Sequence, residues 1–199
     1  MSNPPDQGSR KPVAGRLPTC PTLAVLLLTA PVFAVLVDRI AIAAGNRVIT
    51  DSEIDLRIRL TAFQNAEKPA FTLDARKKAA QLLIDQKLVE REMDVGHYPR
   101  LSAEARKQLL ANFAKDYFKN DPAAMHRTLI EYGLTEDDLE ADLARESDVL
   151  TFLSLRFRPA VSEANAQLAN KRADADMDAW LSDQRKRTKI EYLEKELAP

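Results

Sequence analysis

The side chains that most often perform catalysis or bind metal ions are few in this sequence and stand far apart. Its two histidines are His97 and His126, and its one cysteine is Cys20. A protein zinc site combines several cysteine, histidine or carboxylate ligands, and an activated nucleophile needs a base within hydrogen-bonding reach. Neither pattern surrounds these three residues, so we expect no catalytic residue, no metal ion and no internal disulfide.

The acidic run from Glu136 to Asp138 is a second candidate for metal binding. A calcium loop of the EF-hand type needs oxygen ligands at alternating positions and a glycine at its sharp turn, and this run has neither. It stands instead where a helix is predicted to begin, and negative charge there complements the helix dipole. The five glycines are scattered and form no phosphate-binding loop. We therefore expect no nucleotide and no other cofactor.

Composition indicates one helical domain. The chain has 199 residues, of which 45% are hydrophobic and 30% are charged, and its few glycines suit helices better than an all-β fold. The net charge is −1, and no basic block with interleaved aromatic residues occurs. Nucleic acid is therefore not an expected partner.

The N-terminal region has the pattern of a secretory signal peptide. Arg10, Lys11 and Arg16 precede an apolar run from Thr22 to Val37, and this run is shorter than the ~20 residues that a bilayer span needs. Residues 1–34 are predicted to be a signal peptide that directs residues 35–199 to the periplasm. The alternative is an uncleaved anchor in the inner membrane that faces the periplasm, and contact with a membrane is expected only in that case.

The stretch from Val37 to Phe63 changes its hydrophobic period in the middle. Residues 40–44 alternate as a strand does, Gly45-Asn46 suits a two-residue type II′ turn, and residues 47–50 can return as a second strand. A helix follows, with a cap among Thr50, Asp51 and Ser52 and with Glu53 close behind. Since a lone hairpin is marginal in water, it needs a further strand from elsewhere in the chain.

Amphipathic helices are predicted through the rest of the chain, with apolar stripes that are expected to pack into a common core. One stripe includes Leu82, Val89 and Met93, and another runs from Leu139 through Leu150 to Phe157. The predicted helices cover 72–95, 102–118, 121–133, 135–157 and 162–187.

The closing stretch from Lys189 to Leu193 is short and β-prone, and it is the only further strand candidate. It is therefore expected to pair with the opening hairpin. The predicted fold class is mainly α, a helical module with a small antiparallel sheet that pairs an N-terminal hairpin with a C-terminal strand.

Four stretches between residues 37 and 194 carry a family resemblance. They are VDRIAIAAGNRVITDSEI, then LLIDQKLVEREM followed by Gly96, then YGLTEDDLEADL followed by RFRPAVSE, and finally MDAWLSDQRKRTKIEYL. In their order and spacing they resemble the chaperone module of SurA-type periplasmic proteins, the SurA_N group. The resemblance implies a holdase that works without ATP and binds unfolded envelope proteins, with outer-membrane proteins as the usual clients.

One part of that family's pattern is missing here. SurA-type proteins usually carry parvulin-type prolyl isomerase domains between the long helix and the closing helix, but only EANAQLANKRADAD separates Ser162 from Met177. The paired histidines of a parvulin site are missing as well. We therefore expect no isomerase activity and no other enzymatic activity.

A holdase would offer unfolded chains an apolar cleft, and aromatic and methionine side chains suit such broad binding. Core packing is the competing interpretation for each of them. Two other functions stay open, an envelope structural or adaptor protein with one specific partner, and a non-catalytic companion of a separate parvulin. The candidate client-binding residues are Phe63, Phe71, Phe113, Tyr117, Phe118, Met125 and Tyr132.

Overall fold

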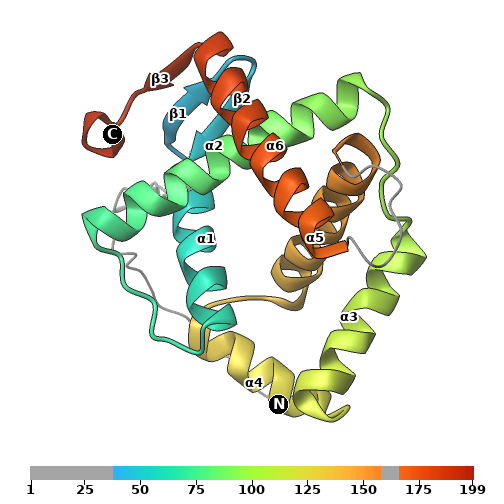
Figure 1. Ribbon diagram of the computed structural model, residues 1–199. Coiled ribbons are helices and arrows are strands. Elements are labelled where there is room, and N and C mark those ends of the chain that lie inside the picture. The colour runs from blue at the N-terminus through green and yellow to red at the C-terminus, as the bar shows by residue number, and fades with distance from the viewer. Residues whose placement is uncertain (1–37, 158–165) are drawn as a thin grey trace, which may run out of the picture. The chain divides into compact units, whose positions relative to one another are not determined.

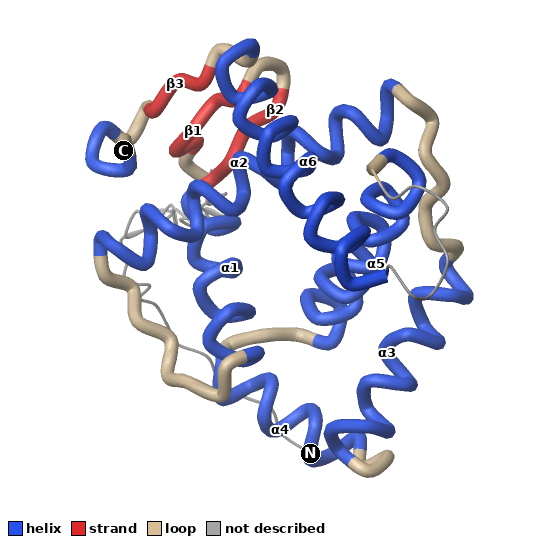
Figure 2. Tube along the Cα trace, in the orientation of Figure 1, coloured by secondary structure: helices blue, strands red, loops and turns tan. Residues whose placement is uncertain are grey.

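The computed structural model describes residues 38–157 and 166–199, most of which lie in helices (Figures 1 and 2). The predicted signal peptide, residues 1–34, and the predicted helix start at Ser162 lie outside the described residues. In chain order the elements are β1 (Ile40–Ala44), β2 (Arg47–Thr50), α1 (Asp51–Gln64), α2 (Leu73–Val95), α3 (Ala103–Phe118), α4 (Pro122–Tyr132), α5 (Glu136–Arg156), α6 (Ala166–Arg187), β3 (Ile190–Tyr192) and a final 3-10 turn (Lys195–Leu197).

The three strands form one antiparallel sheet in the order β2-β1-β3, which confirms the predicted pairing of the two ends. Ala44 lies opposite Arg47 across the hairpin, and Ile42 lies opposite Tyr192 of the closing strand. Gly45 has a φ of 62°, as the first central residue of a type II′ turn requires. Its N–H also donates to the Lys189 carbonyl over 2.9 Å, so the turn itself is tied to the C-terminal segment.

The strand alternation fails at one position. Ile42 is fully buried, but Ile40, which the pattern placed on the same face, is 42% exposed. The register of β1 against β2 shifts between these two residues, because an extra residue in a strand redirects the side chains beyond it. Ala41 and Ile42 are both fully buried, so the core of the sheet begins at Ala41.

Side-chain caps set the helix starts where the sequence indicates them. The Thr50 hydroxyl accepts from the Glu53 N–H at the start of α1, and the Glu53 carboxylate accepts from the Thr50 N–H over 2.9 Å, a complete capping box. Thr135 and Asp138 form the same box at α5. Asp121 caps α4 with Pro122 in its first turn.

Three clusters of buried side chains hold the helices together. The first joins the sheet to α1, α2 and Leu197 of the final turn. The second joins α1, α3, α4 and the start of α5 around Leu60, Leu129 and Leu139. The third joins the end of α2 to α5 and α6 around Met93 and Phe152.

Two apolar stripes are only partly used in these clusters. Val89 and Met93 are buried as predicted, whereas Leu82 of the same stripe is 54% exposed. On α5, Leu150 is 63% exposed, and Phe152 is fully buried in its place against α6. The stripes are wider than the faces that neighbouring helices cover, and their uncovered edges remain at the surface.

Candidate functional site

An open groove of about 430 Å³ lies among side chains of α1, α2, α5 and α6, and we call it the α2–α5 groove. An apolar cavity of about 150 Å³ can hold a benzene molecule, so the groove has room for about two or three side chains of a bound chain. Its charged and amide lining comes from Arg57, Asp85, Gln86, Asp142, Arg145 and Glu146, and its apolar lining from Leu82, Val89, Val149, Leu150 and Met177.

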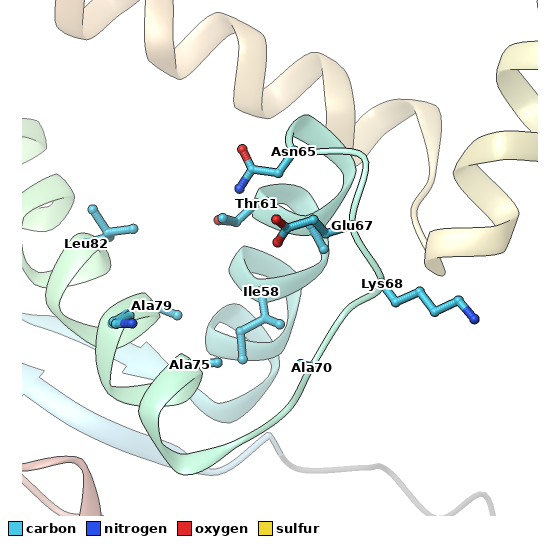
Figure 3. A pocket seen from close by; sticks show the side chains of 11 residues that line it. Ile58, Thr61, Asn65, Glu67, Lys68, Ala70, Ala75, Ala79 and Leu82 are labelled. Atoms are coloured by element: carbon cyan, nitrogen blue, oxygen red, sulfur yellow. The ribbon is translucent and has the colours of Figure 1, made fainter.

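Leu82 joins this groove to two further depressions. One, of about 320 Å³, lies between α1, α2 and their connecting loop, where Ile58 faces Ala79 while Lys68 points away (Figure 3). The other, of about 470 Å³, lies between α2 and the C-terminus beside Leu197. The exposed side chain of Leu82 therefore borders three hollows, which extends the apolar surface along α2.

A buried carboxylate organises the inner wall of the groove. Asp142 of α5 is 1% exposed and accepts hydrogen bonds from Arg57 of α1 (2.7 Å), Arg145 (2.8 Å) and Gln64 (3.1 Å). A buried charge is tolerated only when it is paired and hydrogen-bonded. These contacts satisfy Asp142 and fix α1 against α5 beside the groove.

A bidentate ion pair attaches α6 to α2 next to the groove. Arg185 donates to both carboxylate oxygens of Asp85, each over 2.6 Å. The hydrogen bond to Asp85 raises the pKa of Arg185 above its ordinary value. Such fork-shaped pairs define orientation as well as proximity, so α6 and its Met177 are held beside α2.

Glu146 differs from the other charged residues of the groove. Its Oε1 accepts from the neutral amide of Gln64 over 2.8 Å, and within residues 38–157 and 166–199 it has no cationic partner. Asp142 and Asp85 are both neutralised by arginines. Arg57, Arg145 and Arg185 carry three positive charges against the three negative charges of Asp142, Asp85 and Glu90, which Arg145 approaches to 3.7 Å. Glu146 therefore leaves one negative charge at the margin of the groove.

The predicted client-binding residues lie away from this groove. Phe63, Phe113, Phe118 and Tyr132 pack around α4 with Met125, which is 4% exposed. Their role as client contacts stays a prediction, but their packing gives them a structural role in the second cluster. The closest ring pairs with Phe63 are Tyr132 at 5.5 Å and Phe113 at 6.1 Å.

The last two of the predicted residues remain at the surface. Tyr117 is 73% exposed and stacks on Phe113 with ring centroids 4.5 Å apart. Phe71 is 49% exposed, and the Arg59 guanidinium lies 5.7 Å from its ring centroid. Both are accessible, but neither lines the α2–α5 groove. Of the groove residues, the sequence predicts Leu82 and Leu150 as core residues and assigns no role to Val149.

The histidines occupy unrelated positions. His97 follows α2 with a φ of 52°, and His126 Nδ1 lies 3.9 Å from Glu136 Oε1 at the surface. In the part of the chain that the structure describes, no three side chains of metal-binding type are grouped closely enough to hold an ion. None of the helices in that part combines the length and apolar character that crossing a bilayer requires.

Comparison with known proteins gives no further guide to this surface. No protein-family model and no curated protein matches the chain. Function is therefore inferred from the α2–α5 groove, from the way the two ends of the chain meet, and from the sequence motifs.

Proposed function

We propose that this protein is an ATP-independent holdase of the SurA type, which binds unfolded polypeptide segments in the α2–α5 groove and keeps them from aggregating. Its clients would be envelope proteins, chiefly outer-membrane proteins, met in the periplasm after export or from an inner-membrane anchor. The observation that carries the proposal is the exposure of Leu82 and Leu150, 54% and 63%, on two helices that line one groove.

Energetics favour an occupant for such a groove. Exposed apolar side chains that share a groove gain free energy when a partner covers them, and covering a leucine fully is worth about 1.5–3 kcal/mol. A client segment that covers Leu82, Leu150 and Val149 would gain part of this free energy from each of the three side chains. Much of that gain is lost in ordering the client, so binding would be modest in strength and reversible without ATP.

The lining also favours broad over specific binding. Small-molecule sites place a few polar groups to orient their ligand, but here Asp142 and Asp85 are already satisfied by arginines of the same chain. Met177 contributes a flexible thioether to the apolar wall, and methionine adapts to ligands of different shape. Shape-tolerant apolar contact suits many unfolded sequences.

The test is suppression of aggregation. An unfolded outer-membrane β-barrel protein and two unrelated unfolded proteins are diluted from urea, and light scattering is followed with and without the purified protein. We expect suppression of all three at near-stoichiometric amounts. The double variant Leu82→Gln/Leu150→Gln should lose most of this effect, because glutamine keeps the helix but removes the apolar surface.

The matched control is Leu73→Gln/Leu155→Gln. These leucines lie on the same two helices with similar exposure, 49% and 60%, but outside the groove. The control should retain full suppression. Equal loss in both double variants, or no suppression by the unaltered protein, contradicts the proposal.

Partner capture and prolyl isomerase turnover, measured beside aggregation, separate the other functions that the sequence left open. An adaptor would suppress no aggregation and would capture a single partner with high selectivity. A companion of a separate parvulin would raise the turnover of that isomerase without showing turnover alone. Turnover of a proline peptide by this protein alone would instead favour an enzyme.

A further inference from the structure

We propose that the α2–α5 groove selects apolar segments that carry a lysine or arginine beside their apolar residues. Glu146 is the residue that forms an ion pair with this basic side chain. This inference rests on the proposed function, because it names the kind of client segment that the same groove prefers. Two observations support the inference: the charge balance of the groove and the position of Glu146 relative to Leu150.

Glu146 stands one helical turn before Leu150 on α5. Side chains four residues apart lie on the same face of a helix, and both of these line the groove. A segment whose apolar residue covers Leu150 would therefore bring a neighbouring residue within reach of the Glu146 carboxylate.

Gln64 holds this carboxylate without neutralising it. The Gln64 amide donates to Glu146 Oε1 over 2.8 Å and to Asp142 Oδ2 over 3.1 Å. The second oxygen of Glu146 has no hydrogen-bond partner among the described residues. Glu146 is thus oriented by a neutral group, and its second oxygen is open to a cation from outside.

The neighbouring cations are already engaged. Arg57 and Arg145 both pair with Asp142, and Arg185 pairs with Asp85. Glu90, which Arg145 approaches to 3.7 Å, is the third carboxylate beside these three arginines, so no positive charge among them is left over for Glu146. A basic residue on the client therefore finds an unpaired anion, whereas an acidic residue meets repulsion.

The expected preference is modest because Glu146 is exposed. Ion pairs at a protein surface contribute about 0.2–1 kcal/mol, which corresponds to a change in Kd of about 1.4- to 5-fold. Screening by salt should remove most of it near 1 M ionic strength, where the Debye length is about 3 Å.

The experiment uses three fluorescent peptides with identical apolar residues and one flanking position that is lysine, glutamine or glutamate. Anisotropy titrations with the purified protein at low salt should give the lowest Kd for lysine and the highest for glutamate. The difference in Kd between the lysine and glutamate peptides should become smaller at high salt. Glu146→Gln should remove the lysine preference, so that the lysine and glutamine peptides bind with equal Kd.

Glu140→Gln on the same helix, outside the groove, is the matched control and should keep the preference. Equal Kd values for the three peptides, or a lysine preference that survives Glu146→Gln, overturn this inference while leaving the holdase proposal intact. Failure of all three peptides to bind, together with no suppression of aggregation, overturns both.

Discussion

Arg76 and Glu194 form an ion pair across 118 positions of sequence, with Arg76 Nη2 3.0 Å from Glu194 Oε2. The same guanidinium donates to Asp51 Oδ1 over 2.9 Å and to Asp55 Oδ1 over 2.8 Å. Arg39, just before β1, donates to the other oxygens of Asp51 and Glu194. One network of charges therefore joins the entry to β1, the first turns of α1 and α2, and the C-terminal segment.

Removing Arg76 should loosen this junction. The side chain is 20% exposed, so Arg76→Gln removes a partly buried guanidinium from three carboxylates and leaves Asp51 and Glu194 with Arg39 alone. The expected loss in the free energy of unfolding is about 1–2 kcal/mol, between the values for surface and buried pairs. Urea denaturation measures it. Lys78→Gln, which removes a fully exposed i,i+4 pair with Asp74, should have a smaller effect; an equal effect would contradict the role of the network.

The same junction should make stability depend on pH. Burial alone would raise the pKa of Asp51, but hydrogen bonds within the network, chiefly from Arg39, hold that pKa below its ordinary value of 3.8. A carboxyl group whose pKa is lower in the folded state contributes stability above its unfolded pKa and loses it as pH falls through the folded pKa. We therefore expect unfolding to become easier below about pH 4.

Asp51→Asn provides the measurement for this pH effect. The unfolding free energy of the unaltered protein and the variant is compared between about pH 6 and about pH 3. The difference between the two proteins should be largest near neutral pH and should narrow in acid. A difference that is constant over this range would show that Asp51 does not titrate as a stabilising carboxylate.

The C-terminal turn should contribute to the core despite its short length. Leu197 is 1% exposed and packs in the same cluster as Ile42 and Ile84. Leu197→Ala should therefore cost about 2–5 kcal/mol, the range for large-to-small changes at buried leucines. Leu193→Ala, at a residue that is 59% exposed, should cost much less. Thermal melts of both variants measure this difference. Equal and small losses of stability would mean that the C-terminal turn does not contribute to the core.

Local signals explain why the fold could be predicted. Gly45 fixes the turn by its φ, Thr50 and Glu53 mark the start of α1 with a capping box, and each acts within a few residues. The pairing of β3 with β1 is long-range, yet it followed by elimination because one further strand candidate remained. The turn, the helix start and the strand pairing could be predicted because they do not depend on the angles at which the helices cross.

The groove could not be predicted because it depends on those crossings. An apolar stripe tells which face of a helix is apolar, but not how much of it a neighbour covers. Leu82 and Val89 belong to one stripe, and Val89 is buried in the third cluster while Leu82 stays exposed. The sequence likewise does not show that α3 and α4 bring Phe113 and Met125 together in the second cluster, and the role of these residues as client contacts stays a prediction.

Trp180 offers a direct measure of how α6 packs. It is the one tryptophan of the chain, and its ring lies 5.5 Å from that of Phe152 and 5.5 Å from the Arg156 guanidinium. Phe152→Ala removes a fully buried ring and should cost about 3–5 kcal/mol. It should also shift tryptophan emission to longer wavelength, because water gains access to the indole. Phe71→Ala, at a half-exposed ring remote from Trp180 in sequence and outside the third cluster, should leave the emission unchanged. An unchanged emission in Phe152→Ala would mean that α6 does not depend on the aromatic contact with α5 for its position beside the groove.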